Sequence, residues 1–244
     1  MPPHLPSMPR DVLARMRQEL EENIDPKTRD GAQRFFKEEV KFHGVKSAAV
    51  RKIAAKHFQE IKGQEKEEIF SLCRDLLETG YGEEAFIAFQ WSYNLRSGFQ
   101  PADFSVFESW LVRYVDNWAK CDTLCNHALG SFLEMYPEFL VNLKGDWALS
   151  ENRWLRRASA VTLILPARKG LFLEEAFAIS EILLQDKDDM VQKGYGWLLK
   201  EASKKHQEEV FNFVMRRKAE MPRTALRYAI EKMPTDLKKR AMAR

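Results

Sequence analysis

The sequence contains few cysteines and no long apolar run, and these two absences exclude several classes of protein. Three cysteines among 244 residues are too few and too irregularly spaced for a disulfide framework, which indicates a reducing compartment and makes the cytoplasm the default location. The opening segment, residues 1–9, is rich in proline and resembles neither a signal peptide nor a membrane span. We expect this segment to be flexible and the protein to have no membrane partner.

The short motifs of several enzyme classes are also absent. The chain has no GxGxxG fingerprint, no GxxxxGKS/T loop, no HExxH, no paired CxxC and no GxSxG elbow, which argues against nucleotide-dependent and zinc-protease chemistry. Cys121, Cys125 and His127 lack a fourth ligand for a tetrahedral zinc site, so no metal is predicted. Any catalysis must then rest on carboxylate, aromatic and basic side chains, without a cofactor.

Positive charge is concentrated in the last part of the sequence. The formal net charge is only +3, but residues 216–244 hold ten Lys and Arg and three acidic residues, a balance of +7. The remaining residues hold 29 basic and 33 acidic side chains, a balance of −4. Such a cluster can lie along a polyanion and release its counterions, and the simpler alternative is a solvated helical tail. Residues 234–244 are interpreted as a basic C-terminal tail.

Hydrophobic periodicity predicts an all-α fold. Apolar residues recur at three- and four-residue spacings, and the alternating pattern that predicts strands is absent. Pro101 marks a helix start, and Gly170 closes a helix that ends in a basic pair. The composition, with 45% hydrophobic and 31% charged residues, predicts one soluble globular domain over residues 1–244, or two closely packed ones. We expect the protein to be a monomer. The clearest helical segments are residues 48–58, 66–79, 104–115, 155–165, 174–184 and 191–205.

The helices recur at a spacing that indicates stacked pairs. Trp118, Trp154 and Met190 are 36 residues apart in each step, and each opens an amphipathic segment. Two helices per unit, with a period in the upper thirties to forties, are typical of HEAT-like or armadillo-like repeats. In such an α-helical solenoid the second helix of each pair lines a concave surface, which suits an elongated partner. Repeat scaffolds bind proteins as often as nucleic acids, so the architecture alone does not identify the partner.

Four residues at corresponding places in successive repeats form the candidate site. Trp118 and Asp122 are four residues apart and share one helix face, Arg157 follows in the next repeat, and Trp197 comes after it. Two aromatic faces, a carboxylate and a guanidinium can together hold a cationic ligand that bears phosphate. Each residue also has a structural alternative. Either tryptophan can pack in the core, Asp122 can cap a helix that begins at Thr123, and Arg157 can pair with an Asp of another repeat.

Two glycines beside Trp197 need an explanation of their own. Gly194 and Gly196 lie inside a predicted helix, where each costs about 1 kcal/mol relative to Ala. Their presence is explained if the backbone closely approaches either a ligand or a neighbouring helix. Both explanations are compatible with the sequence.

Three segments carry the candidate residues: 116–122 (DNWAKCD), 152–158 (NRWLRRA) and 191–201 (VQKGYGWLLKE). Their sequence, order and spacing resemble the motif blocks of the AlkD family, the HEAT-like-repeat DNA alkylation repair glycosylases. Residues 42–46 resemble the N-terminal block of that family, and residues 227–230 the C-terminal one. The resemblance therefore covers most of the chain.

The resemblance implies a DNA glycosylase that needs no cofactor and acts on double-stranded DNA containing alkylated bases. It also implies that the lesion stays stacked in the duplex while the enzyme reaches the sugar from the concave surface, without base flipping. The match is imperfect at Asn117, because a member of the family has two adjacent tryptophans where this chain has Asn117 and Trp118. The candidate site residues are Asp122, Trp118 and Trp197 for catalysis, and Arg157, Lys193, Lys200 and Arg227 for DNA binding.

Two hypotheses about function follow. In the first, the protein excises positively charged N3- or N7-alkylpurines and leaves an abasic site. A carboxylate at Asp122 would stabilise the positive charge that develops on the sugar. In the second, the chain is a non-catalytic repeat module that binds DNA or a protein partner through the same surface. Asp122 separates the two, because a carboxylate beside a phosphate backbone is repulsive and serves no purpose in a module that only binds.

Overall fold

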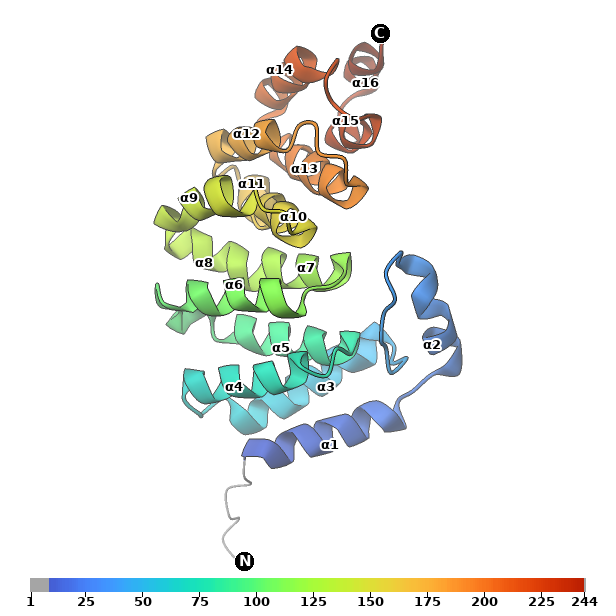
Figure 1. Cartoon of the computed structure of the whole chain (residues 1–244), viewed down its shortest axis with the longest axis vertical. Coiled ribbons are helices and arrows are strands. Elements are labelled where there is room, and N and C mark those ends of the chain that lie inside the picture. The colour runs from blue at the N-terminus through green and yellow to red at the C-terminus, as the bar shows by residue number, and fades with distance from the viewer. Residues whose placement is uncertain (1–8, 244) are drawn as a thin grey trace, which may run out of the picture. The chain divides into compact units, whose positions relative to one another are not determined.

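The computed structural model describes residues 9–243, and within this range every regular element is a helix (Figure 1). Two isolated bridges, between Ile24 and Val45 and between Lys41 and Tyr81, are the β-type pairings among the described residues. The prediction of an all-α fold is therefore confirmed. The flexibility expected for residues 1–9 falls outside the described range except at Pro9, where α1 begins. None of the helices within residues 9–243 has the length and apolar character of a membrane span.

The chain divides into two compact units, one ending at Gln100 and the other beginning at Pro101. In the first unit α1 packs on α3 and α4, and both of these pack on α5. Short 3₁₀ turns follow α2 and α5. The α-helices of the first unit are α1 (Pro9–Glu22), α2 (Pro26–Ala32), α3 (Ser47–Ile61), α4 (Lys66–Leu77) and α5 (Gly82–Asn94).

The second unit consists of shorter helices joined by turns. Its connections include π-helical turns at Cys125–Leu129 and Leu143–Trp147 and a 3₁₀ turn at Pro137–Phe139. Its α-helices are α6 (Asp103–Tyr114), α7 (Trp118–Leu124), α8 (Gly130–Met135), α9 (Leu140–Asn142), α10 (Arg153–Val161), α11 (Ile164–Lys169), α12 (Leu173–Ile182), α13 (Asp189–Ala202), α14 (Gln207–Arg217), α15 (Arg223–Ile230) and α16 (Thr235–Met242). The segment interpreted as a basic tail therefore contains a helix, α16.

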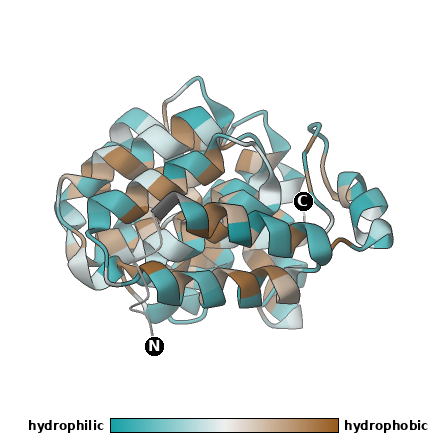
Figure 2. Ribbon diagram, turned by 90° about the horizontal axis from the view of Figure 1, so that it is seen from below, coloured by the Kyte–Doolittle hydropathy of each residue, from teal (hydrophilic) through white to brown (hydrophobic). Residues whose placement is uncertain are grey.

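Helices of the second unit pack in a repeating order. Contacts run from α7 to α10, from α10 to α13 and from α13 to α15, and Figure 1 shows these helices following one another along one side of the unit, with α9, α12 and α14 along the other. Hydrophilic and hydrophobic residues alternate along the helices (Figure 2), as expected where one face of each is buried. This is the packing of an α-helical repeat array.

The 36-residue spacing predicted from the sequence has a structural basis in the helix caps. The side chains of Asn117, Asn152 and Asp188 each accept a hydrogen bond from a backbone N–H in the first turn of α7, α10 and α13. An Asn or Asp at this position satisfies a donor that the helix itself leaves unpaired. The three caps are 35 and 36 residues apart, so the helices that hold the candidate residues begin at equivalent points.

The helix predicted over residues 155–165 is wrong in one respect. The structure ends α10 at Val161 and begins α11 at Ile164. Pro166 lies in the first turn of α11, where it has no N–H to donate to the carbonyl of Thr162 and its ring crowds that carbonyl. A continuous helix through Thr162 is therefore broken, whereas the closure at Gly170 is confirmed, with φ of 95° at that residue.

Glu83 fixes the loop that precedes α3 in the first unit. Its carboxylate, in the first turn of α5, accepts hydrogen bonds from the backbone N–H groups of His43, Gly44 and Val45 at 3.0, 2.9 and 3.1 Å. Glu83 is only 5% exposed, so these bonds form in a largely water-free site. Gly44 has φ of 95°, and a Cβ there would lie 2.4 Å from the Cβ of Arg29. The loop is thus held by a single carboxylate and a glycine that no other residue can replace without strain.

The glycines of α13 permit close packing of helices. A Cβ on Gly196 would lie 2.7 Å from the Cβ of Tyr228 and 2.8 Å from the carbonyl oxygen of Ala225, both in α15. A Cβ on Gly194 would lie 3.4 Å from Cγ of Arg157 in α10. Of the two explanations drawn from the sequence, the approach to a neighbouring helix accounts for Gly196, whereas a Cβ on Gly194 would make only an ordinary van der Waals contact.

We expect Gly196→Ala to lower the free energy of unfolding by up to about 2 kcal/mol. Overpacking against the backbone of α15 costs about 1 to 3 kcal/mol, and the higher helix propensity of Ala returns about 1 kcal/mol. Chemical denaturation followed by circular dichroism measures the change. Gly145→Ala is the matched control, since a Cβ at this helical position has no neighbour within 4 Å. Equal effects of the two substitutions would show that α13 and α15 are not in close contact.

Candidate functional site

Asp122 and Arg157 form a two-point ion pair between successive repeats. Nε of Arg157 donates to Oδ1 of Asp122 at 2.9 Å, and Nη2 donates to Oδ2 at 2.8 Å. The side chains are 6% exposed for Arg157 and 15% for Asp122. This planar fork fixes both carboxylate oxygens, because guanidinium and carboxylate match in shape and charge. The sequence-based alternative in which Arg157 pairs with an Asp of another repeat is confirmed.

Arg157 also contacts a third repeat. Its Nη1 donates to the backbone carbonyl of Met190 in the first turn of α13. The stem of Arg157 lies against Gly194 at this point, where an added Cβ would be 3.4 Å from Cγ of the arginine. One guanidinium therefore joins α7, α10 and α13, and the position of the Asp122 carboxylate depends on all three helices.

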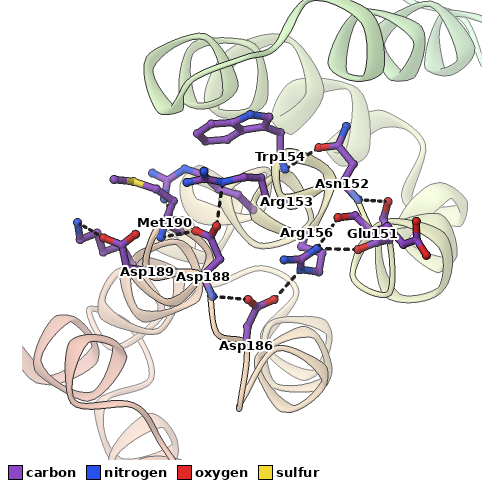
Figure 3. Close-up of polar contacts among 12 residues, drawn as sticks. Glu151, Asn152, Arg153, Trp154, Arg156, Asp186, Asp188, Asp189 and Met190 are labelled. Atoms are coloured by element: carbon purple, nitrogen blue, oxygen red, sulfur yellow. Dashed lines mark hydrogen bonds and ion pairs between the residues drawn. The ribbon is translucent and has the colours of Figure 1, made fainter. Parts of the chain in front are cut away.

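A second set of ion pairs fixes α10 beside the segment that leads into α13 (Figure 3). Nε of Arg153 lies 2.9 Å from Oδ2 of Asp188, and Nε of Arg156 donates to Oδ2 of Asp186 at 2.6 Å. Nη1 of Arg156 also donates to the carbonyl of Glu151 at 2.9 Å. These contacts hold the first turns of α10, so they limit the movement of Arg157, which directly follows Arg156.

Asp122 does not cap a helix, which excludes one structural alternative. It lies inside α7, and the cap of that helix is Asn117, whose side chain accepts from the N–H groups of Ala119 and Lys120. Thr123 uses its hydroxyl within the same helix, donating to the carbonyl of Ala119 at 2.7 Å. The carboxylate of Asp122 is therefore directed away from its own backbone and toward Arg157.

The surroundings of Asp122 alter its acidity. Burial raises the pKa of Asp122 above its ordinary value, while the charge and hydrogen bonds of Arg157 oppose that rise. Its two oxygens have about four acceptor positions between them, of which Arg157 occupies two. A ligand that presents positive charge or a water molecule can use the others.

Both candidate tryptophans are half-buried. Trp118 opens α7 one turn before Asp122, so the two side chains share a helix face. Trp197 lies on α13 seven residues after Met190, and its Nε1 donates to Oε1 of Glu201 at 3.4 Å. The structure thus brings Asp122 and Arg157 into direct contact, whereas Trp197 is hydrogen-bonded to a different acid, Glu201.

The predicted DNA-binding cations differ in their surroundings. Nζ of Lys193 donates to Asp189 at 3.1 Å, and Nζ of Lys200 donates to Glu231 at 2.9 Å. Arg227, on α15, is exposed. A phosphate would have to compete with a carboxylate at either lysine, whereas Arg227 is accessible to solvent.

Sequence reasoning missed Glu201, although a signal was present. Trp118 and Asp122 are four residues apart, and Trp197 and Glu201 repeat that spacing on α13. Each acid also pairs with an arginine of another helix, Asp122 with Arg157 and Glu201 with Arg168. Comparison of the two segments for acids at this spacing identifies Glu201.

Cys121 and Cys125 are fully buried, on α7 and on the π turn that follows it. Burial raises the pKa of the Cys121 thiol, which keeps it protonated and a poor metal ligand. Over residues 9–243 no group of His, Cys, Asp and Glu side chains has an arrangement that would hold a metal ion.

The fold and the site together define a helical-repeat protein with a buried carboxylate–guanidinium pair linking its repeats. Comparison with known families matches residues 16–233 to the family described as DNA alkylation repair enzyme. The chain belongs to this family, as its AlkD-like motifs indicate, and this membership gives it a role in the repair of alkylated DNA.

A solved structure with the same fold is that of a protein described as a predicted DNA alkylation repair enzyme from Enterococcus faecalis. The TM-score is 0.78 with 15% sequence identity, over 87% of this chain and 98% of the other. At this identity the likeness concerns the fold. A search of curated proteins gives no match.

Proposed function

We propose that the protein is a DNA glycosylase that releases positively charged N3- or N7-alkylpurines from duplex DNA by hydrolysis of the N-glycosidic bond, without base flipping. The observation that carries the proposal is the Asp122 carboxylate, which is largely buried and fixed at both oxygens by Arg157, one turn from the half-buried Trp118. A fixed anion beside an aromatic face suits a substrate in which positive charge moves from a base to a sugar.

Hydrolysis of the N-glycosidic bond requires little from the protein beyond a fixed carboxylate beside an aromatic ring. Alkylation at a ring nitrogen makes the purine cationic, so the base leaves with the electron pair of the broken bond to C1′ and becomes neutral. The sugar then carries the positive charge, which Asp122 stabilises. Water adds its oxygen to C1′ and loses a proton, giving an abasic site and a free base. No cofactor takes part, because the leaving group is already activated.

Arg157 contributes preorganisation to this mechanism. It reduces the net charge of the site, but it also fixes the carboxylate before the substrate arrives, so little reorganisation is needed as the sugar becomes positive. In this proposal Arg157 acts on the DNA through Asp122, and phosphate contact by its guanidinium remains a prediction.

Electrostatic attraction brings the duplex to the site. Lys193 and Lys200 contribute on α13, and the segment 216–244, which includes Arg227 on α15, carries a net charge of +7. Cations along a phosphate backbone release counterions, so binding should weaken as salt rises. We place the DNA on the concave side of the repeat array, along the helices that hold these residues.

The test is the release of free base from duplex DNA that contains N7-methylguanine. Wild-type protein is expected to release the base faster than spontaneous depurination does at the same pH. If no enclosed pocket receives the base, a duplex with a bulky cationic adduct is also a substrate. Absence of release from both duplexes would refute the glycosylase proposal.

A non-catalytic binding module is the second candidate. The observation in its favour is that the Asp122–Arg157 pair links three helices and so has a structural use of its own. Binding of methylated and unmethylated duplex with equal affinity, together with no base release, would support this candidate.

The pH dependence of base release is expected to show an acid limb set by Asp122. Protonation removes the charge that stabilises the sugar cation, so activity falls as the pH drops through the pKa of this carboxyl. Because burial raises that pKa above its ordinary value despite the opposing charge of Arg157, the loss should occur at higher pH than for an ordinary aspartate. Single-turnover rates, corrected for spontaneous depurination, measure the limb.

The raised pKa of Asp122 has the opposite effect on the stability of the fold, which it favours at low pH. A carboxyl whose pKa is raised by folding binds its proton more tightly in the folded state, so its contribution favours folding at low pH and is lost as the pH rises through the folded pKa. Circular dichroism at each pH therefore serves as the control. An acid limb that coincides with unfolding would contradict its assignment to Asp122.

A further inference from the structure

Trp197 is joined to a buried carboxylate on its own helix. Its indole N–H donates to Oε1 of Glu201 at 3.4 Å, one turn further along α13. Glu201 is 4% exposed, whereas the indole is half-buried. The carboxylate therefore lies inside the protein and the aromatic ring extends from it toward the surface.

Two cations hold the other oxygen of Glu201. Nε of Arg168, on α11, donates to Oε2 at 2.7 Å, and Nζ of Lys204 lies 2.6 Å from the same atom. Although burial opposes it, hydrogen bonding from Lys204 and Arg168 lowers the pKa of Glu201, so the group is ionised at neutral pH. The cations fix the carboxylate at Oε2 and leave Oε1 directed at the indole.

We propose that Glu201 is a positioning residue for Trp197, holding the indole by its N–H so that the aromatic face is presented to the cationic base. This inference rests on the proposed function and extends it to a residue that does not touch the substrate. The anionic acceptor has two effects. It restricts rotation of the side chain, and it polarises the indole, which makes the ring face more negative and more attractive to a cation.

The competing explanation is that Glu201 serves only to link α11 to α13 through Arg168. Removal of Glu201 would then weaken the fold, and base release would change independently of Trp197. The two explanations differ in whether the effect of Glu201 depends on the indole N–H. A test must therefore remove that donor and the acceptor separately and together.

The first measurement is a double-mutant cycle on base release. Glu201→Ala is expected to slow release roughly 2- to 30-fold, the range that cation–π attraction spans. In a Trp197→Phe background, which keeps an aromatic ring but has no N–H, the same substitution is expected to have little further effect. Equal losses in both backgrounds would overturn the proposal. Should Glu201→Ala fail to fold, Glu201→Leu fills the space of the side chain without an acceptor oxygen and takes its place in the cycle.

The second measurement does not depend on activity. Of the six tryptophan indole N–H signals in an ¹⁵N–¹H spectrum, the one missing in Trp197→Phe belongs to Trp197. It is expected to shift upfield when Glu201 is replaced and to move little in Arg168→Ala, which keeps the carboxylate. An unchanged signal on replacement of Glu201 would overturn the positioning role. Absence of base release by wild-type protein would refute the proposed function alone, since this signal would still report whether Glu201 holds the indole.

Discussion

Replacement of Asp122 by Asn is expected to slow base release by about 10²- to 10³-fold. Asn has almost the same shape as Asp but no charge, so the positive charge that develops on the sugar loses its nearest anion. Single-turnover release from N7-methylguanine duplex measures this loss directly. An unchanged rate would leave the activity in place and refute the assigned role of Asp122.

The structure shows that this substitution also affects folding. Arg157 would keep its charge in a largely buried position, where it contacts the two carboxylate oxygens at 2.9 and 2.8 Å. Asn offers one acceptor oxygen and sets an NH₂ donor against the guanidinium, which a protonated carboxyl does not have to do. Removing one member of a buried ion pair costs about 3 to 5 kcal/mol. The activity of Asp122→Asn must therefore be compared at a temperature where its circular dichroism matches that of the wild type.

A double substitution separates catalysis from stability. In Asp122→Asn with Arg157→Met the buried guanidinium is gone, so we expect most of the stability to return. Base release is expected to stay as low as in Asp122→Asn, because the anion is still missing. Recovery of activity together with stability would indicate that the ion pair matters only for folding.

Replacement of Glu83 by Ala is expected to lower the free energy of unfolding by about 3 to 5 kcal/mol. Three backbone N–H groups, of His43, Gly44 and Val45, would lose their acceptor in a site with little access to water. Each unpaired buried donor costs about 1 to 3 kcal/mol. The effect is therefore expected to be larger than that of Gly196→Ala.

Glu68→Ala is the control for this prediction. Glu68 is also an acidic residue in the first turn of a helix, α4, but it is exposed, so its removal should change stability by no more than about 0.5 kcal/mol. Denaturation of both variants, followed by circular dichroism, compares them directly. Similar effects of the two substitutions would mean that the carboxylate of Glu83 does not hold the loop.

The helical fold was predictable because its signals are local. Apolar spacing involves residues within a turn or two of one another, so the sequence carries it directly. The caps at Asn117 and Asn152 are equally local but were not predicted, since Asp122 was considered as a cap instead. The break between α10 and α11 was missed because apolar residues continue through it, and the periodicity outweighed Pro166. The role of Gly196 depends on α15, which lies outside any local window.

The sequence predicted which residues belong to the candidate site better than it predicted which of them touch one another. Asp122 and Trp118 were placed on one helix face because their spacing determines it, and the structure retains that relation. The partner of Arg157 depends on the rotation of α10 against α7 and α13, which packing decides. Glu201 was missed because the spacing of Trp197 and Glu201 was not compared with that of Trp118 and Asp122, whereas its pairing with Arg168 of another helix could not be read from a local pattern.

The pairing of Asp122 with Arg157 has a consequence for how this activity can be lost in evolution. A lineage that loses the acid first would retain a buried, unpartnered cation, and one that loses the arginine first would retain a buried anion. Either intermediate is unstable, so the two positions should change together or not at all. Among relatives, an arginine kept without its acid would then mark a chain whose neighbouring helices have rearranged, while joint replacement would mark one that has kept the scaffold and given up the chemistry.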